Sequence, residues 1–589
     1  MRPSSGVNPT ELFPAMNTPC HPCPTVIHLC LIAAAALPVW TLKAQGGEPV
    51  STTVSSTAIA SAATSKHYEN LILALRKSDS VIPPQSPVHP VAAMFNREAV
   101  IPPQCYTKTE GHYNACYVCH QDSKAGRENV MNDRDLQEAY SFSDLGMTNH
   151  WKNLFEDRSG RVAKISDAWI QDYVGQDNYS ELAARLEAVG FEGWIPDLTN
   201  LQLSADAFDA QGFAKDSSHW VAFNYKPLPS TFWPTNGSTD DVMIRLAERF
   251  RTDRDGNYCR DIYAANLAIV EAAIKGVSTI GCLPIDEAAV GRDLDGDGTM
   301  GIAQRIANAG GWVGAAEGMA YDSHLYPEGT EFLHTVRYIG VGEDGRITPS
   351  TRMKEVRYMR KWRAYAKPIY ARRYQLEGFD KEAGNLPGYQ NLGARGLDNG
   401  NGWAVQGFIE DRKGRLRANT YEETSSCMGC HTSIGSTIDK TFSFARKVDG
   451  ARGWKYIDLV GMPDAPNKGE TTGEIHTYLE RVGGGSEFRH NQEMIDRWLR
   501  SDGTADVEKL AKAEDVYQLI TPSPQRAITL NKAYRTIVED QDYIFGRDAA
   551  VTPPGNVYTE VDNKTAPRLP AGRIFDWNII LDWPQGYLE

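Results

Sequence analysis

Two short segments of the chain repeat one pattern of cysteine and histidine. The first is Ala115-Cys116-Tyr117-Val118-Cys119-His120, and the second is Ser426-Cys427-Met428-Gly429-Cys430-His431. In both segments two residues separate the cysteines, and the histidine follows the second cysteine directly. One helical turn over this spacing brings the two thiols together and places the imidazole next to them. The chain therefore offers two similar sets of one imidazole and two thiols.

The C-x-x-C-H spacing is typical of covalent haem attachment. The thiols can form thioether bonds with the two vinyl groups of the porphyrin, and the imidazole can bind the iron. A structural zinc site and a dithiol redox pair also use C-x-x-C, but neither requires the histidine. A zinc ion shared by both cysteine pairs is an alternative. The sequence predicts two haem c groups, held by Cys116, Cys119 and His120 and by Cys427, Cys430 and His431.

The two pentapeptides resemble the haem-attachment sites of c-type cytochromes. The resemblance covers only these segments and their flanks, and it implies a cytochrome c-like haem region near each end of the chain. Dihaem cytochrome c peroxidases are a more distant likeness. Residues 121–426 form a longer interval than members of that family typically have. Their catalytic residues therefore cannot be carried over to this chain.

Hydrophobic periodicity predicts a mainly α fold with a large helical and loop-rich middle region. Residues 261–275 (DIYAANLAIVEAAIK) have apolar residues at helical spacing, and Gly276 behind them favours a helix end. Residues 352–373 are rich in Lys and Arg, and their apolar residues at every third position also indicate a helix with one buried side. Further helices are predicted at residues 179–189, 240–250, 492–500, 505–520 and 524–539.

The N-terminal sequence indicates export. Residues 26–40 (VIHLCLIAAAALPVW) form an apolar run that is short for a membrane span and typical of a signal peptide. Cys30 follows Ile27-His28-Leu29 rather than small residues, so no lipid anchor is expected, and no later stretch predicts a membrane span in the mature chain. The predicted order is signal peptide (1–44), flexible leader (45–66), first haem c region (67–165), middle region (166–400) and second haem c domain (401–589).

Composition limits the classes of partner. The 589 residues have a formal net charge of -14 and a pI near 5.5, so the chain would repel a phosphate backbone. Nucleic acid is therefore excluded as an expected partner. A hydrophobic fraction of 41% is that of a folded, water-soluble protein. Together with the signal peptide, this composition predicts a periplasmic or secreted protein whose partner is a periplasmic redox protein.

The second axial position of each iron decides between electron transfer and catalysis, because an open position admits a small ligand. Met462, in Gly461-Met462-Pro463, resembles the loop methionine that follows C-x-x-C-H in many small cytochromes c, so it is the expected ligand of the second haem. Met147 is the first choice for the first haem, although an open site is also compatible with the sequence. Rival ligands are His476, His490 and Met494 for the second haem and Met131, His150 and His112 for the first.

Two features of the middle region suggest other chemistry. Asp293, Asp295 and Asp297 alternate as calcium ligands do in the first half of an EF-hand loop, but position twelve is Gln304 instead of glutamate. The alternatives are a calcium site and an acidic turn without metal. Cys259 and Cys282 could form a disulfide, unless the remaining Cys105 pairs with one of them.

Three functions fit these observations. The first is an exported dihaem electron-transfer protein that connects redox partners. The second is a peroxidase-like or oxygenase-like oxidoreductase in which one haem has an open face, and the third is a subunit that docks haems onto a larger complex. Some of the cations of residues 352–373 could pair with haem propionates or dock an acidic redox partner, although a helix with one buried side accounts for them most simply. Electron transfer is the preferred prediction, because Met462 suggests a closed iron and no residue identifies itself as a catalytic base.

Overall fold

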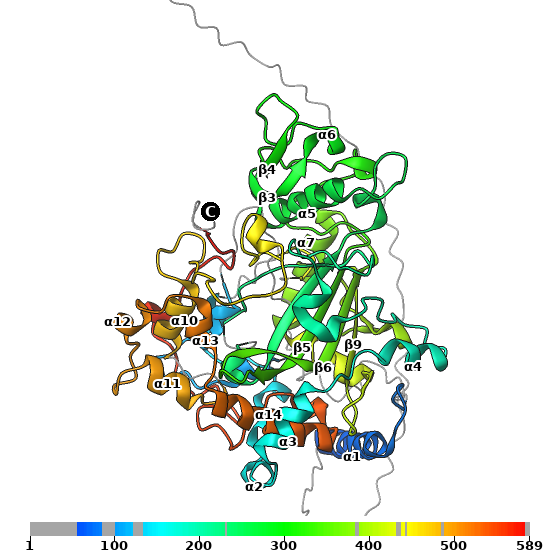
Figure 1. Cartoon of the computed structure of the whole chain (residues 1–589). Helices are drawn as coiled ribbons and strands as arrows, with labels where there is room; N and C mark the ends of the chain where they lie inside the picture. The colour runs from blue at the N-terminus through cyan, green and yellow to red at the C-terminus, as the bar shows by residue number, and fades with distance from the viewer. Residues whose placement is uncertain are drawn as a thin grey trace, which may run out of the picture. The chain divides into compact units, whose positions relative to one another are not determined.

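The computed structural model describes residues 56–84, 101–121, 134–229, 233–382, 388–431, 437–441, 444–483 and 488–583 (Figure 1). The chain divides into two compact units, Met1–Ser55 and Ser56–Glu589. The first unit, with most of the predicted signal peptide and leader, lies outside the described residues. All structural statements below concern the second unit.

An eight-stranded antiparallel sheet forms the centre of this unit, so the predicted mainly α fold is wrong. The chain is 35% helix and 17% strand, and Figure 1 shows β5, β6 and β9 side by side in the sheet. The strand order is β1-β2-β5-β6-β9-β8-β7, and β10 pairs with β9. The strands are β1 (Val221–Ala222), β2 (Thr239–Arg245), β5 (Glu331–Val341), β6 (Ile347–Lys361), β7 (Gln390–Asn391), β8 (Leu397–Asp398), β9 (Trp403–Glu410) and β10 (Leu416–Ala418).

Both faces of the sheet are buried, which explains why two strands were predicted as helices. Residues 240–245 belong to β2 and residues 352–361 to β6, so these parts of the predicted helices 240–250 and 352–373 are strands, whereas residues 367–373 lie in helix α7 (Lys367–Glu382). On β6, Val356 packs in the apolar cluster of one sheet face and Met359 in the cluster of the other. When both faces need apolar residues, a strand loses its simple alternation and its pattern can imitate a helix.

The two sheet faces have different surroundings. One face packs against a cluster that includes Met243, Leu333, Val356 and Phe408. The opposite face carries the residues that alternate with these along each strand and joins the cluster around helix α5 (Arg260–Lys275). This α5 face is called the site face below, because the second cysteine motif lies against it. Its apolar residues are Val242, Ile244, Phe332, Met359 and Val405.

Several predicted helices are confirmed. Residues 261–275 form α5, which ends at Gly276 with φ +66°, and residues 524–539 form α14 (Pro524–Asp540) behind the cap Ser523. The prediction for 505–520 is wrong in one respect, since two helices form there. Asp506 and Asp515 each cap a new helix with the side chain, and each cap sets a separate helix start.

The remaining elements surround the sheet. Figure 1 shows α14, α3 and α1 near one another and β3, β4 and α5 together in another part of the unit. The helices are α1 (Ser56–Lys77), α2 (Ser159–Val162), α3 (Asp167–Gly175), α4 (Leu182–Ala188), α6 (Glu287–Val290), α7 (Lys367–Glu382), α8 (Tyr421–Ser425), α9 (Met428–His431), α10 (Glu474–Val482), α11 (Gln492–Trp498), α12 (Val507–Leu510) and α13 (Val516–Ile520). A second sheet pairs β3 (Ile280–Asp286) with β4 (Ile302–Ile306).

Candidate functional site

The second cysteine motif forms one helical turn. The amides of Cys430 and His431 both donate to the carbonyl oxygen of Cys427, each at 3.3 Å. The preceding helix α8 begins with a capping box in which Thr420 and Glu423 each accept the other's backbone amide. The turn therefore starts from a rigid helix end.

A buried ion pair supports this helix. Both carboxylate oxygens of Glu423 accept hydrogen bonds from the guanidinium of Arg417, each at 2.8 Å. Glu423 is buried, and its pairing with Arg417 of β10 holds α8 in place.

The first cysteine motif forms the same turn on a different support. His120 donates its amide to the carbonyl oxygen of Cys116 at 3.0 Å, in the short 3-10 helix η4 (Ala115–Val118). Asn114 caps this helix, since its side-chain oxygen accepts the amide of Tyr117 at 3.1 Å. The side-chain nitrogen of Asn114 donates to the side-chain oxygen of Gln137 at 2.7 Å. Hydrogen bonds between buried side-chain amides therefore hold the turn in place.

Residues from the end of the chain complete the support of the first motif. Trp577 donates its indole N–H to the carbonyl oxygen of Tyr117, and the two rings meet edge to face with centroids 5.7 Å apart. Gln137 donates to the carbonyl oxygens of His120 and Phe575 at 2.8 and 2.9 Å. The first motif is thus held by residues from the predicted second haem domain.

The two motifs lie close together in space. The charge of a Cys430 thiolate raises the pKa of Cys119, although burial is the larger cause. Burial also raises the pKa of Cys116 to about 11 and that of Cys430 to about 12. Cys105 is near both motifs, because Cys119, Cys116 and Cys430 all raise its pKa in addition to burial. Sequence could not predict this proximity, since residues 121–426 separate the motifs.

A cavity joins the second motif to the site face of the sheet. His431 and Cys427 line it on one side, and His334 of β5 and Arg357 of β6 line it on the other. His334 is paired directly with Arg357 across the strands and with Val242 on its other side, so all three project from one sheet face. The imidazole of His334 therefore faces the same cavity as that of His431.

The pKa values of the two imidazoles in this cavity, those of His334 and His431, are both lowered. Burial, then His431 and Arg357, lower the pKa of His334 to about 3. Burial, followed by Arg357, lowers the pKa of His431 to about 4. Both imidazoles are therefore neutral at pH 7, which is the form that binds metals.

One buried guanidinium has an unsatisfied donor at this site. Arg446 lines the cavity, is 4% exposed and forms an ion pair with Glu474 through Nη1. Among the residues that the structure describes, no acceptor lies within hydrogen-bonding distance of its Nη2. Arg446 also lies near the first motif, because its charge lowers the pKa of Cys119. A buried, unpaired guanidinium donor suits an anionic group placed between the motifs.

Among the described residues, the motif cysteines are not gathered as the ligands of one zinc ion would be. In the described part of the chain, ligand atoms of three His, Cys, Asp or Glu residues lie within 4.8 Å of one another at Glu287, Asp293 and Asp295. The four motif cysteines are not grouped in this way, so they do not form a zinc cage. The cavity beside His431 encloses about 70 Å³, and the whole space between its lining residues, including the part open to solvent, is about 900 Å³. Because a porphyrin is larger than the enclosed part, a haem bound here would extend into the open part.

The predicted axial methionines lie elsewhere. Met462 is 4% exposed and packs in the apolar cluster that contains Tyr117 and Val118 of the first motif. It is not among the residues lining the cavity of His431. Met147 packs with Cys105 in another cluster, and Met131 lies outside the described residues. Both methionine assignments stay predictions, whereas His334 was missed because a histidine in a strand carries no recognisable motif.

The other predicted sites have simpler surroundings. Asp293 and Asp295 group with Glu287 rather than with Asp297, and Asp297 accepts the amide of Thr299 at 2.7 Å. The calcium prediction therefore keeps two of its three residues in one cluster. Cys259 and Cys282 are not bonded to each other, so the predicted disulfide is not formed in this structure.

Comparison with known proteins places the chain in a family. A family model described as “-like lipoprotein” matches residues 88–517. An uncharacterized lipoprotein of Aquifex aeolicus (strain VF5) is 31% identical over 548 residues, covering 82% of this chain and 92% of the relative. The chain belongs to this lipoprotein family. No solved structure matches it.

Family membership corrects one prediction and supports another. The resemblance to c-type cytochromes as a family is wrong, because the matching family and relative are lipoproteins. Two pentapeptides were too short a basis for family membership. A lipoprotein is exported, as the signal peptide predicted, and is associated with the cell envelope, whereas the sequence led us to expect no lipid anchor. Across the described residues, no helix has the length and apolar character needed to cross a bilayer.

Proposed function

We propose that this lipoprotein-family chain carries two covalently attached haems in the periplasm and transfers electrons between redox partner proteins. The observation that carries the proposal is the proximity of two C-x-x-C-H turns that residues 121–426 separate in the sequence. Each turn offers two thiols for thioether bonds and one imidazole for the iron. A bound haem would supply a one-electron redox centre at each turn, and adjacent centres can exchange electrons.

The surroundings of the second turn support electron transfer over ligand binding. His334 faces His431 across one cavity and is held in place by the sheet, so it is our proposed second axial ligand in place of Met462. Two neutral imidazoles would close both axial positions of that iron. Arg357 and Arg446 in the same cavity would pair with propionate groups.

Haem content tests the attachment. The full chain, exported from a host with haem-attachment machinery, should contain two haems in a pyridine haemochrome assay. Cys116→Ala combined with Cys119→Ala should leave one haem, and so should Cys427→Ala combined with Cys430→Ala. Cys259→Ala combined with Cys282→Ala is the matched control and should keep both. A chain with no haem, or with stoichiometric zinc, would refute the proposal.

Electron paramagnetic resonance tests the axial ligand. His334→Ala should remove one low-spin signal of the oxidised protein and allow carbon monoxide to bind half of the reduced haem. Met462→Ala should leave the signal of the second haem unchanged, because Met462 does not line the cavity of His431. The reverse result, with loss of the second haem's signal only in Met462→Ala, would restore the methionine assignment and exclude His334.

A further inference from the structure

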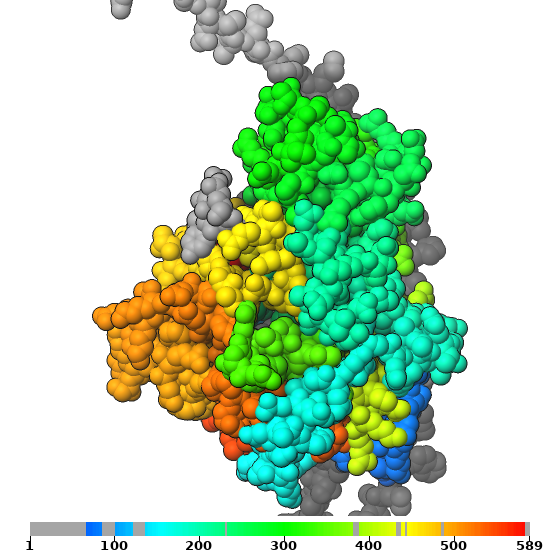
Figure 2. Space-filling model, viewed as in Figure 1, coloured from blue at the N-terminus to red at the C-terminus, as the bar shows by residue number. Residues whose placement is uncertain are grey.

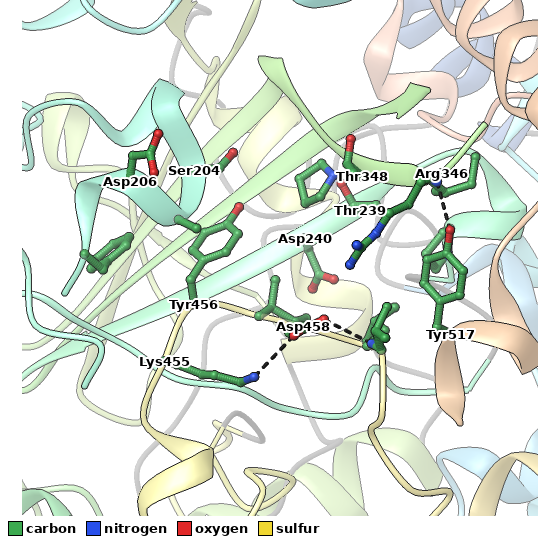
Figure 3. Close-up of a pocket in the computed structure, with 18 of the residues that line it drawn as sticks. Ser204, Asp206, Thr239, Asp240, Arg346, Thr348, Lys455, Tyr456, Asp458 and Tyr517 are labelled. Carbon is green, nitrogen blue, oxygen red and sulfur yellow. Dashed lines mark hydrogen bonds and ion pairs between the residues drawn. The ribbon is translucent and has the colours of Figure 1, made fainter. Parts of the chain in front are cut away.

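A second pocket of about 670 Å³ lies beside the cavity of the second motif. Figure 3 shows its labelled side chains, with Arg346 pointing into the pocket and Asp240 near its centre. Figure 2 shows a hollow in the surface where the segments around residues 345 and 460 meet. The volume is that of a small-molecule site. Its apolar walls come from Leu203, Phe208, Pro227, Pro234, Leu459 and Val460.

Asp240 connects this pocket to the cavity of His431. Its side chain lines both spaces, and the residue is 9% exposed. It lies on β2 directly opposite Val336 of β5, two residues along from the pair formed by Val242 and His334. A single carboxyl group therefore stands between the pocket and the imidazoles of the second motif. Burial, opposed by a hydrogen bond with Tyr225 and by the charge of Arg357 and assisted by Asp241, raises the pKa of Asp240 to about 7, which suits a group that gains and loses a proton near neutral pH.

The wall of the pocket is preorganised. Ser204 has φ 55° and ψ −121°, a backbone conformation that costs energy for a residue other than glycine. Next to it, the hydroxyl of Tyr456 donates to Asp241 at 2.6 Å, and Arg337 donates to the same carboxylate oxygen at 3.0 Å. These buried contacts hold one side of the pocket in place. Local strain over a fixed hydrogen-bond network is more typical of a binding site than of an incidental surface hollow.

We infer that the pocket binds a hydroquinone-type reductant that delivers two electrons to the two haems. The inference rests on the proposed function. Two adjacent one-electron centres match a donor of two electrons, the apolar walls suit an aromatic ring, and Asp240 provides a proton acceptor. Oxidation breaks both O–H bonds of the hydroquinone and yields the quinone. Two bound haems would each supply a centre that accepts one of the two electrons, the Asp240 carboxylate would accept one proton, and water at the pocket mouth would accept the other.

Stopped-flow reduction of the oxidised full chain tests the inference. A water-soluble benzohydroquinone is compared with hexaammineruthenium(II), which donates one electron and no proton. With the hydroquinone, the wild-type rate should fall at least twofold in deuterium oxide, and the ruthenium rate should not. Asp240→Asn and the pocket-filling Leu203→Trp should each lower the ratio of hydroquinone to ruthenium rates at least tenfold.

Leu376→Trp is the matched control for the pocket-filling variant. Leu203 and Leu376 are 51% and 46% exposed, and Leu376 on α7 does not line the pocket, so both rates should stay unchanged. The inference is overturned if Asp240→Asn and Leu203→Trp keep the wild-type ratio while both haems are present. The proposed function would survive that result. It fails separately if the haem count itself is zero.

Discussion

The two cysteine motifs share a pentapeptide pattern and a helical turn, but they stand in different surroundings. The first motif is supported by amide and aromatic side chains, with Asn114, Gln137 and Trp577 holding it against the end of the chain. The second faces a cavity with two imidazoles, two guanidinium groups and the carboxyl of Asp240. The local turn is therefore the same, while the available proton and charge chemistry differs.

Under the proposed function, this difference would separate two roles that the sequence could not separate. The first site would serve as a protected relay, because Asn114, Gln137 and Trp577 are neutral and buried. The second site has titratable groups and an adjacent pocket, so it is where a small donor would enter. The following predictions test this division of roles, starting with the largest expected effect.

Trp577→Ala should damage the first motif more than the second. The substitution removes a side chain that is 4% exposed and its hydrogen bond to Tyr117. Loss of a buried tryptophan should lower the free energy of unfolding by about 3–5 kcal/mol. Urea denaturation measures this loss, and Trp169→Ala, at a position 46% exposed, should change it by less than about 0.5 kcal/mol. Equal loss of both haems in Trp577→Ala would contradict separate supports.

Asp240 should give the second site a pH dependence that the first lacks. Burial raises its pKa to about 7, whereas an unfolded aspartate has a pKa of about 3.9. Between these values the folded chain binds a proton that the unfolded chain does not, so this group's contribution to the free energy of unfolding falls as pH rises from about 4 to 7. At about 1.4 kcal/mol per pKa unit, the fall is at most about 4 kcal/mol.

Urea titrations at several pH values measure the contribution of Asp240. Asp240→Asn should flatten the profile in this window. Asp206→Asn, an exposed aspartate lining the neighbouring pocket, should keep the wild-type profile. A profile that stays the same in Asp240→Asn would show that its carboxyl is ionised across the whole range.

The acidic loop should respond to calcium without changing either motif. Glu287, Asp293 and Asp295 offer three oxygen ligands in one cluster. A dissociation constant of about 1 mM, common in extracellular calcium modules, would add about 1.4 kcal/mol of stability at about 10 mM calcium. Thermal melting should show this gain in the wild type and in Asp253→Asn, but not in Asp293→Asn. An unchanged wild-type melting temperature would support the acidic turn without metal.

The elements that sequence predicted well are those built from local contacts. Helix α5 has apolar residues at helical spacing and Gly276 at its end, and α14 has Ser523 and Pro524 at its start. Strands β2 and β6 were mistaken for helices, because their apolar residues serve two buried sheet faces. The family could not be identified from the motifs, since ten residues of C-x-x-C-H carry no information about the rest of the chain.

The sequence by itself determined the residues and the local geometry of the two turns, and it predicted the export of the chain. Both C-x-x-C-H segments form the same turn, because its hydrogen bonds join residues four apart. Only the tertiary structure decided that the turns meet, that His334 faces His431, and that Asp240 stands between two cavities. Those placements depend on strand pairing and on packing between distant segments, and no local pattern records which strands become neighbours.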